Sequence, residues 1–285
     1  MRLLLGLALL FLVQSQAVAA PAATVEAVQM PAWMERNGRS SPLTPGIELR
    51  SGDQVRTGPQ SRVLIKLGEG SLVKLGENAA LRVAELAPAS DAFKAAMNVL
   101  RGAFRFTTAL VAKERRRDVS IRITTVTVGI RGTDVWGRSR DEREIVCLIE
   151  GSVEVAAEAE APLVLDRPRQ FYQRQGGRTQ PVGEVQPEQL AQWAKETEIE
   201  AGKGAVRRRG PWKVQLLSTA SAREAMRLSD RVREAGYPAA VYPEKDGEKR
   251  VYRVRIQNLP ARADAQALAA RLRESHDVPR AEARR

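Results

Sequence analysis

The residues best placed to do chemistry are polar side chains that recur at every second position in two short segments. The segments lie forty residues apart and read Trp212-Lys213-Val214-Gln215-Leu216 and Tyr252-Arg253-Val254-Arg255-Ile256. Successive residues of a β-strand point to opposite faces of a sheet. One face would then present ammonium, guanidinium and amide groups, which suit an anionic or hydroxyl-rich ligand. An ordinary solvated sheet face shows the same alternation and is the alternative interpretation.

The alternation assigns each side chain of these strands to a face. The residues expected to face the core are Trp212, Val214, Leu216, Tyr252, Val254 and Ile256. Those expected on the uncovered face are Lys213, Gln215, Leu217, Arg253, Arg255 and Gln257.

Each segment is followed by an apolar stripe at helical spacing, so the whole cassette is duplicated. The two stripes are Ala225, Leu228, Val232 and Ala235, and then Ala265, Leu268, Ala269 and Leu272. Ser221 and Glu224 form a capping-box signature for the first helix, and Gly236 suits its C-terminal end. A short strand over residues 238–241, a turn over 245–248 and a weak edge strand near Val278 complete the order β-α-β-β-α-β. Both helices should cover one side of the sheet, because each has a single apolar face.

The scarcity of histidine and cysteine limits the chemistry that the chain can do. His276 and Cys147 are the only residues of these types among 285, so no ordinary zinc or iron site can be assembled. Acid–base or triad chemistry lacks a histidine in the first part of the chain. We therefore expect no metal, no cofactor and no catalytic residues. Cys147 lies in an apolar strand pattern over residues 144–149 and should be buried and inert.

The first residues have the pattern of an export signal. Arg2 precedes an apolar run over residues 3–13, and Ala17-Val18-Ala19 supplies the small residues of a cleavage site. The run is too short to span about 30 Å of hydrocarbon, so we expect cleavage near Ala19 and no transmembrane anchor.

Positive charge is concentrated in the last 81 residues, where 19 Lys and Arg stand against 10 Asp and Glu. A basic surface first suggests nucleic acid. Because export separates the protein from nucleic acid, we expect no nucleic-acid partner, and instead anionic envelope polymers or lipid headgroups. A solvated basic surface without a partner is the alternative.

Residues 24–182 have the pattern of an all-β domain, in which short apolar runs alternate with turn-forming residues. A hairpin is expected from 63–67 and 71–75, and later strands from 119–128, 133–137 and 145–149. Residues 87–97 are expected to form a short helix. A linking helix is expected within 185–200, followed by a Gly- and Arg-rich linker. The predicted divisions are a signal peptide over 1–19, a β domain over 24–182, a linker over 183–210 and an α+β domain over 211–285.

The β domain resembles the FecR domain, through residues 49–58, 67–71, 128–134 and 150–155. The resemblance implies a β-rich extracytoplasmic module, named for regulators that relay iron-uptake signals to sigma factors. Those regulators place a cytoplasmic segment and a membrane span before the module. With an export signal in that place, we expect an interaction module without a sigma-factor partner. Arg131 and Asp134 of the third signature are expected to fix a turn and to pair with each other.

The C-terminal cassette resembles the SPOR domain over residues 210–274, through its two alternating segments and the helices that follow them. The resemblance implies binding to septal peptidoglycan, specifically to glycan strands stripped of their stem peptides. By position, the binding residues of the family correspond to Gln215, Ser218, Tyr242 and Arg253, with Arg255 and Lys213 beside them.

These observations together predict a periplasmic, non-enzymatic protein of a Gram-negative envelope that is localised to the division septum. Its expected partners are glycan strands and, through the FecR-like domain, envelope or divisome proteins. The alternatives are an envelope glycan-cleaving enzyme that uses the SPOR-like domain for targeting, and an RNA-binding sheet of similar topology.

Overall fold

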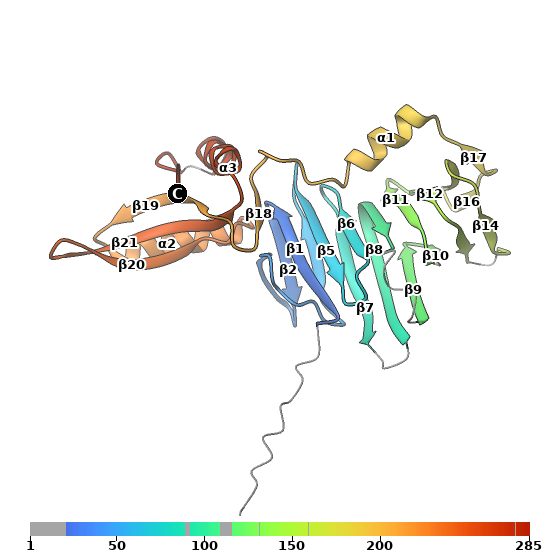
Figure 1. Ribbon diagram of the computed structural model, residues 1–285, viewed down its shortest axis with the longest axis horizontal. Helices are drawn as coiled ribbons and strands as arrows, with labels where there is room; N and C mark the ends of the chain where they lie inside the picture. Colours follow the sequence, from blue (N-terminus) through green and yellow to red (C-terminus); the bar gives the residue numbers. More distant parts are fainter. Residues whose placement is uncertain (1–20, 89–91, 109–115, 131, 159, 277) are drawn as a thin grey trace, which may run out of the picture.

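A computed structural model of the protein describes residues 21–88, 92–108, 116–130, 132–158, 160–276 and 278–285 (Figure 1). The predicted signal peptide and Arg131 lie outside the described residues. The described chain forms a large β domain, followed by a smaller domain that combines a sheet with two helices. The predicted mixed class, all-β and then α+β, is confirmed.

Two ladders of strands make up the N-terminal domain. The first ladder runs β18 (Ala205–Arg207), β1 (Ala23–Gln29), β5 (Arg62–Leu67), β6 (Leu72–Leu75), β8 (Ala92–Thr107), β11 (Asp134–Arg140), β12 (Arg143–Glu150) and β15 (Gln170–Gln175), with β16 (Arg178–Thr179) and β17 (Gly183–Glu184) on β15. The second runs β3 (Arg39–Pro42), β2 (Ala32–Arg36), β4 (Gln54–Thr57), β7 (Ala80–Pro88), β8, β9 (Arg116–Ile123), β10 (Val126–Ile130), β13 (Val153–Ala157) and β14 (Leu163–Leu165).

Strand β8 belongs to both ladders and bends between them. Its first part pairs with β7 and β9, and its last residues pair with β6 and β11. The bend lies at Gly102, which has a φ of +87°. A Cβ at this position would lie 2.5 Å from the Cα of Ala79, so only glycine fits. Apolar side chains from both ladders, such as Val25 and Val128, form one buried core.

Residues 87–88 belong to strand β7 and residues 92–97 to strand β8, so the helix predicted over 87–97 is wrong. Phe93, Ala95 and Met97 are buried, while Lys94 between them is exposed. This two-residue period places alternate side chains on opposite faces of a strand. Pairing with β7 on one side and β9 on the other outweighs the helix preference of alanine, lysine and methionine. The single strand predicted over 119–128 is instead two strands, β9 and β10, joined at Thr124 with a φ of +47°.

Two acidic residues of the FecR-like segments, Asp53 and Asp134, have structural partners. Asp53 is almost fully buried and accepts hydrogen bonds from Arg36 Nε at 2.7 Å, Arg36 Nη2 at 2.6 Å and the Arg50 amide at 2.7 Å. Asp134 accepts two hydrogen bonds from Arg105, at 2.8 and 2.6 Å. The carboxylate expected to pair with Arg131 is thus held by Arg105, and both acids serve to join separate strands.

The predicted linking helix is α1 (Pro187–Lys195), and one tryptophan fixes it to the sheet. Trp193 stacks on Trp136 of β11, with ring centroids 4.8 Å apart, and meets Phe171 edge-on. Cys147 belongs to the same small cluster and is fully buried, as predicted. Burial raises the pKa of its thiol to about 12, so the thiolate that would react is scarcely populated.

The C-terminal sheet has the strand order β20 (Ala240–Asp246), β21 (Lys249–Leu259), β19 (Trp212–Thr219) and β22 (Glu282–Arg284). Helices α2 (Ala222–Glu234) and α3 (Arg262–Ser275) bury their predicted stripes against one side of it. The β-α-β-β-α-β order is confirmed. The edge strand lies at 282–284, however, because Val278 is buried in the segment that follows α3. The second strand, predicted over 238–241, is β20 and extends to Asp246.

Helix α2 is capped at both of its ends as the sequence predicts. Ser221 Oγ accepts from the Glu224 amide at 3.3 Å. At the other end, Gly236 has a φ of +86°, and the Tyr237 amide donates to the Val232 carbonyl at 3.1 Å. This is the Schellman arrangement that a C-terminal glycine favours.

The two domains are packed together along a continuous seam. The Ala32 amide donates to the Gly236 carbonyl at 3.2 Å, and Trp33 Nε1 donates to the Glu234 carbonyl at 3.0 Å. Arg271 of α3 donates to the Met30 carbonyl at 2.7 Å. Strand β18 extends the first ladder beside β1, although the sequence prediction contained no strand in this Gly- and Arg-rich segment (Figure 1). Helices α2 and α3 contact β3 and β18, so the opposite side of the C-terminal sheet stays open.

Candidate binding face of the C-terminal sheet

The open face of the C-terminal sheet lies opposite α2 and α3 and centres on strands β19 and β21. Val214, Val254 and Ile256 are fully buried on the helix side. Lys213 lies between the inward residues Trp212 and Val214, so its side chain points to the open face, as predicted.

A β-bulge in β19 changes the faces beyond Gln215. Gln215 pairs with Arg255, whereas Leu217 pairs with Val254, so Leu216 is an extra residue in the strand. Residues directly opposite in an antiparallel pair share a face. Leu217 therefore turns to the helix side, where it packs against the core, and its predicted place on the open face is wrong.

The same bulge places Ser218 opposite Arg253, on the open face. Without it, strict alternation would have turned Ser218 toward the helices. The exposed hydroxyl of Ser218 and the guanidinium of Arg253 therefore occupy neighbouring positions. The bulge therefore places Ser218 on the face where the SPOR resemblance implies a binding residue.

Arg255 is at the centre of the face and is in contact with two other predicted residues. Its Nε lies 3.5 Å from Gln215 Oε1, at the outer limit of a hydrogen bond. Its guanidinium carbon lies 5.8 Å from the centroid of the Tyr242 ring, a cation–π distance. Tyr242 itself pairs with Arg253 across β20 and β21. The structure thus brings Gln215, Tyr242, Arg253 and Arg255 together.

Glu244 is the residue of this face that the sequence analysis missed. Its carboxylate accepts from Arg253 Nη1, from Arg255 Nη1 and, at 3.2 Å, from Arg255 Nη2. The two arginines lower the pKa of Glu244, through the hydrogen bond from Arg255 above all. Since Glu244 follows Tyr242 by two residues on one strand, strand alternation would have placed it on the same face.

The arginine–glutamate cluster is joined by ion pairs and remains partly accessible. The side chains of Arg255, Arg253 and Glu244 are 11%, 27% and 32% exposed. Their spare guanidinium nitrogens and the carboxylate can donate to and accept from hydroxyl groups, and Tyr242 supplies an aromatic surface. Glu244 and Asp246 together balance the charges of Arg253 and Arg255, so this part of the face is suited to a hydroxyl-rich ligand more than to a simple anion.

The described residues contain neither a cluster of metal-ligating side chains nor a membrane-spanning helix. No group of three or more His, Cys, Asp or Glu side chains in the described parts of the chain is arranged to hold a metal ion. None of the helices in those parts carries an apolar stretch long enough to cross a bilayer.

Comparison with protein families identifies both parts of the chain. Residues 53–154 match the family described as FecR protein, and residues 209–279 match the SPOR domain family. The chain therefore contains a FecR domain and a C-terminal SPOR domain, as its motifs predicted. A SPOR domain implies peptidoglycan binding and a place in the cell envelope. No curated protein matches the chain.

Among solved structures, the chain is similar to two crystal structures of a candidate anti-sigma factor from Parabacteroides distasonis. The first is 13% identical, covers 70% of this chain and 97% of its own, and gives a TM-score of 0.42. The second is 14% identical, covers 78% and 91%, and gives a TM-score of 0.41. Similarity at this level carries no argument about function.

Proposed function

Since the chain contains a FecR domain and a SPOR domain, we propose that it is an exported, periplasmic, non-enzymatic protein that binds peptidoglycan glycan strands. The ligand is glycan stripped of its stem peptides, which accumulates at the division septum. The binding residues are Gln215, Ser218, Tyr242, Arg253, Arg255 and Lys213. The FecR domain serves as an interaction module for envelope or divisome proteins.

The observation that carries the proposal is the open face described above. Tyr242, Arg253 and Arg255 converge there with Gln215, and the helices occupy only the other side of the sheet. Stem-peptide carboxylates would meet Glu244, whereas the hydroxyl groups of bare glycan can use both the arginines and this carboxylate. This difference supports a preference for stripped strands.

The test is co-sedimentation of the full chain with purified sacculi, before and after an amidase removes the stem peptides. We expect stripped sacculi to retain more protein than intact ones. The double variant Gln215→Ala, Arg253→Ala should lose most of this retention. Arg227→Ala is the matched control, because Arg227 is an exposed arginine on α2, on the far side of the sheet.

Equal retention of the double variant and the wild-type protein would exclude the assigned face. Circular dichroism of each variant separates lost binding from lost folding. Release of soluble glycan fragments from the sacculi by the wild-type protein would instead favour the targeted-enzyme alternative.

A further inference from the structure

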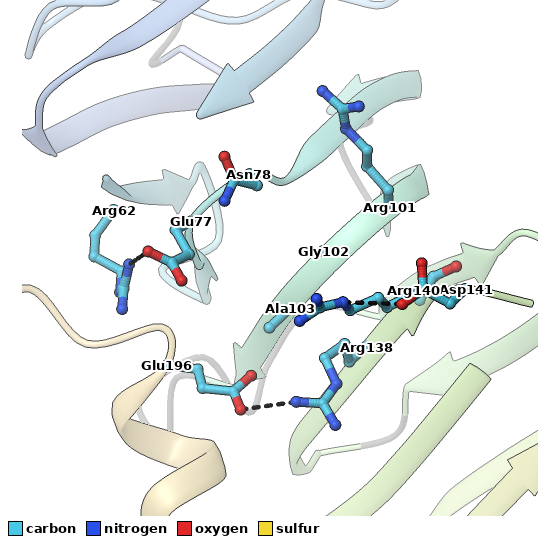
Figure 2. A pocket seen from close by; sticks show the side chains of 11 residues that line it. Arg62, Glu77, Asn78, Arg101, Gly102, Ala103, Arg138, Arg140, Asp141 and Glu196 are labelled. Atoms are coloured by element: carbon cyan, nitrogen blue, oxygen red, sulfur yellow. Dashed lines mark hydrogen bonds and ion pairs between the residues drawn. The ribbon is translucent and has the colours of Figure 1, made fainter. Parts of the chain in front are cut away.

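A cavity of about 710 Å³ lies in the FecR domain, where β8 bends between the two ladders (Figure 2). Its walls come from the start of β5, the turn after β6, the bend of β8, the end of β11 and the residue after α1. The lining residues that carry hydrogen-bonding groups are Arg62, Glu77, Asn78, Arg101, Arg138, Ser139, Arg140, Asp141 and Glu196. A volume of this size accommodates a small organic molecule.

Guanidinium groups dominate the chemistry of this cavity. Four arginines, Arg62, Arg101, Arg138 and Arg140, contribute to its walls. A smaller adjoining cavity of about 300 Å³ shares two of them and adds Arg143. Planar guanidinium forks match the two oxygens of a carboxylate or phosphate.

Several of these donors are not used within the described part of the protein. Arg101 makes no ion pair there, and the buried Nε of Arg62 has no hydrogen-bond partner. Arg62 is held nearly in place, with its side chain 15% exposed, its Nη1 donating to the Ser61 carbonyl at 2.8 Å and the same atom 4.0 Å from Glu77 Oε2. A buried donor without a partner carries a free-energy cost that a bound acceptor removes.

Arg138 is oriented by two contacts that leave part of its fork available. Its Nη1 donates to Glu196 Oε1 at 2.8 Å, and its guanidinium carbon lies 5.3 Å from the centroid of the Trp136 ring (Figure 2). Burial raises the pKa of Glu196, and Arg138 acts in the opposite direction. The cavity wall is therefore built from fixed groups at this point.

The wall also contains acceptors, which narrows the kind of ligand. Glu77, Asp141 and Glu196 alternate with the arginines around the cavity, and Asn78 and Ser139 add neutral polar groups (Figure 2). A bare anion would use the arginines alone. A ligand that also carries hydroxyl groups can donate to the carboxylates, as sugars do.

We propose that this cavity is a binding site for a small sugar that carries an oxyanion, either a carboxylate or a phosphate. Arg140, whose guanidinium lies between Arg62 and Arg101 in Figure 2, supplies donors to the oxyanion, the two flanking arginines add positive charge, and the hydroxyl groups of the sugar donate to Glu77 and Glu196. The site belongs to the FecR domain and does not depend on glycan binding by the SPOR domain.

Isothermal titration calorimetry of the full chain tests the proposal with four probes, namely glucuronate, glucose 6-phosphate, glucose and inorganic phosphate. We expect at least one of the two sugar anions to bind about tenfold or more tightly than glucose and inorganic phosphate. The sugar anion that binds more tightly identifies the source of the oxyanion. Failure of both sugar anions to bind at about 10 mM overturns the proposal. Inorganic phosphate that binds as tightly as glucose 6-phosphate overturns the assignment to a sugar.

The double variant Arg101→Gln, Arg140→Gln tests the residues. Both arginines are exposed, and Arg140 pairs with the exposed Asp141 alone among the described residues, so the fold should persist. Affinity for the sugar anion should fall by about tenfold or more, because each charged hydrogen bond contributes at least that factor. Arg82→Gln, an exposed arginine of β7 outside the cavity, is the matched control and should bind as the wild type does. Unchanged affinity of the double variant rules out the site.

Discussion

Substitutions at two glycines of the SPOR domain test, through the free energy of unfolding, how closely the two domains are packed. Gly236 and Gly247 have φ angles of +86° and +61°, a region that disfavours any residue with a Cβ. Their surroundings differ. A Cβ at Gly236 would lie 2.7 Å from two atoms of the Trp33 ring and 3.0 Å from Pro31, both in the N-terminal β domain. A Cβ at Gly247 would meet nothing within 4 Å.

The expected magnitudes follow from this difference. Gly247→Ala should lower the free energy of unfolding by about 1–2 kcal/mol, the cost of a left-handed backbone for alanine. Gly236→Ala should carry the same backbone cost and a further 1–3 kcal/mol or so, because the new methyl group overpacks the seam against Trp33.

The assay is guanidinium chloride unfolding of the full chain, followed by far-ultraviolet circular dichroism, in a double-mutant cycle with Trp33→Ala. Removing the indole vacates the space that the methyl group needs. In the Trp33→Ala background, most of the additional cost of Gly236→Ala should therefore disappear, and Gly247→Ala should cost the same in both backgrounds.

Two results would refute this reasoning. If Gly236→Ala costs no more than Gly247→Ala, the domains are not packed at the seam as described. If the additional cost of Gly236→Ala persists without Trp33, then the strain arises within the SPOR domain and not between the domains.

Three further predictions follow from single residues. Trp193→Ala removes the stack on Trp136 that fixes α1, so the α1 amides should exchange hydrogen at least about tenfold faster while the core strands of the ladder stay protected. Cys147 should resist iodoacetamide at pH 8 in the folded protein and react after unfolding, because its pKa is raised to about 12, and labelling of the native thiol would contradict its burial. Burial lowers the pKa of His276, so stability present above its ordinary value of 6.5 should be lost as pH falls through the folded-state value. His276→Gln, which removes the one histidine of the chain, should flatten thermal midpoints between about pH 7 and 5 relative to the wild type, and equal slopes would refute the assignment.

Strand alternation predicted the faces of β19 correctly as far as Leu216 and failed at Leu217. The failure has a physical cause, since the bulge at Leu216 arises from pairing with β21 and leaves no sign in the residues of β19 alone. The miss at residues 87–97 is similar. Alanine, lysine and methionine favour a helix locally, but β8 is held between two neighbouring strands.

Other features depend on contacts between residues far apart in the chain. Strand β18 is a three-residue segment within a Gly- and Arg-rich stretch, and β1 supplies its pairing partner. The cavity of the FecR domain joins Arg62 with Arg138 and Glu196, which no spacing in the sequence connects. Glu244, by contrast, could have been predicted from the sequence, because it shares a strand and a face with Tyr242.

The repeat gives the SPOR domain a symmetric core and an asymmetric face. Gln215 and Arg255 are equivalent in the two copies, and they pair directly across β19 and β21. Lys213 is the copy of Arg253, and its partner on β22 is Arg284, whereas the partner of Arg253 on β20 is Tyr242. One half of the face thus holds the Tyr242 ring beside two arginines paired with Glu244, and the other half holds Lys213 beside Arg284, which is paired with Glu282. A glycan strand bound across the sheet, as proposed, would meet different chemistry at its two ends, so the face has a means to select one direction of the strand. A symmetric face would accept both directions equally, and the presence of Arg284 at the position that corresponds to Tyr242 removes that symmetry.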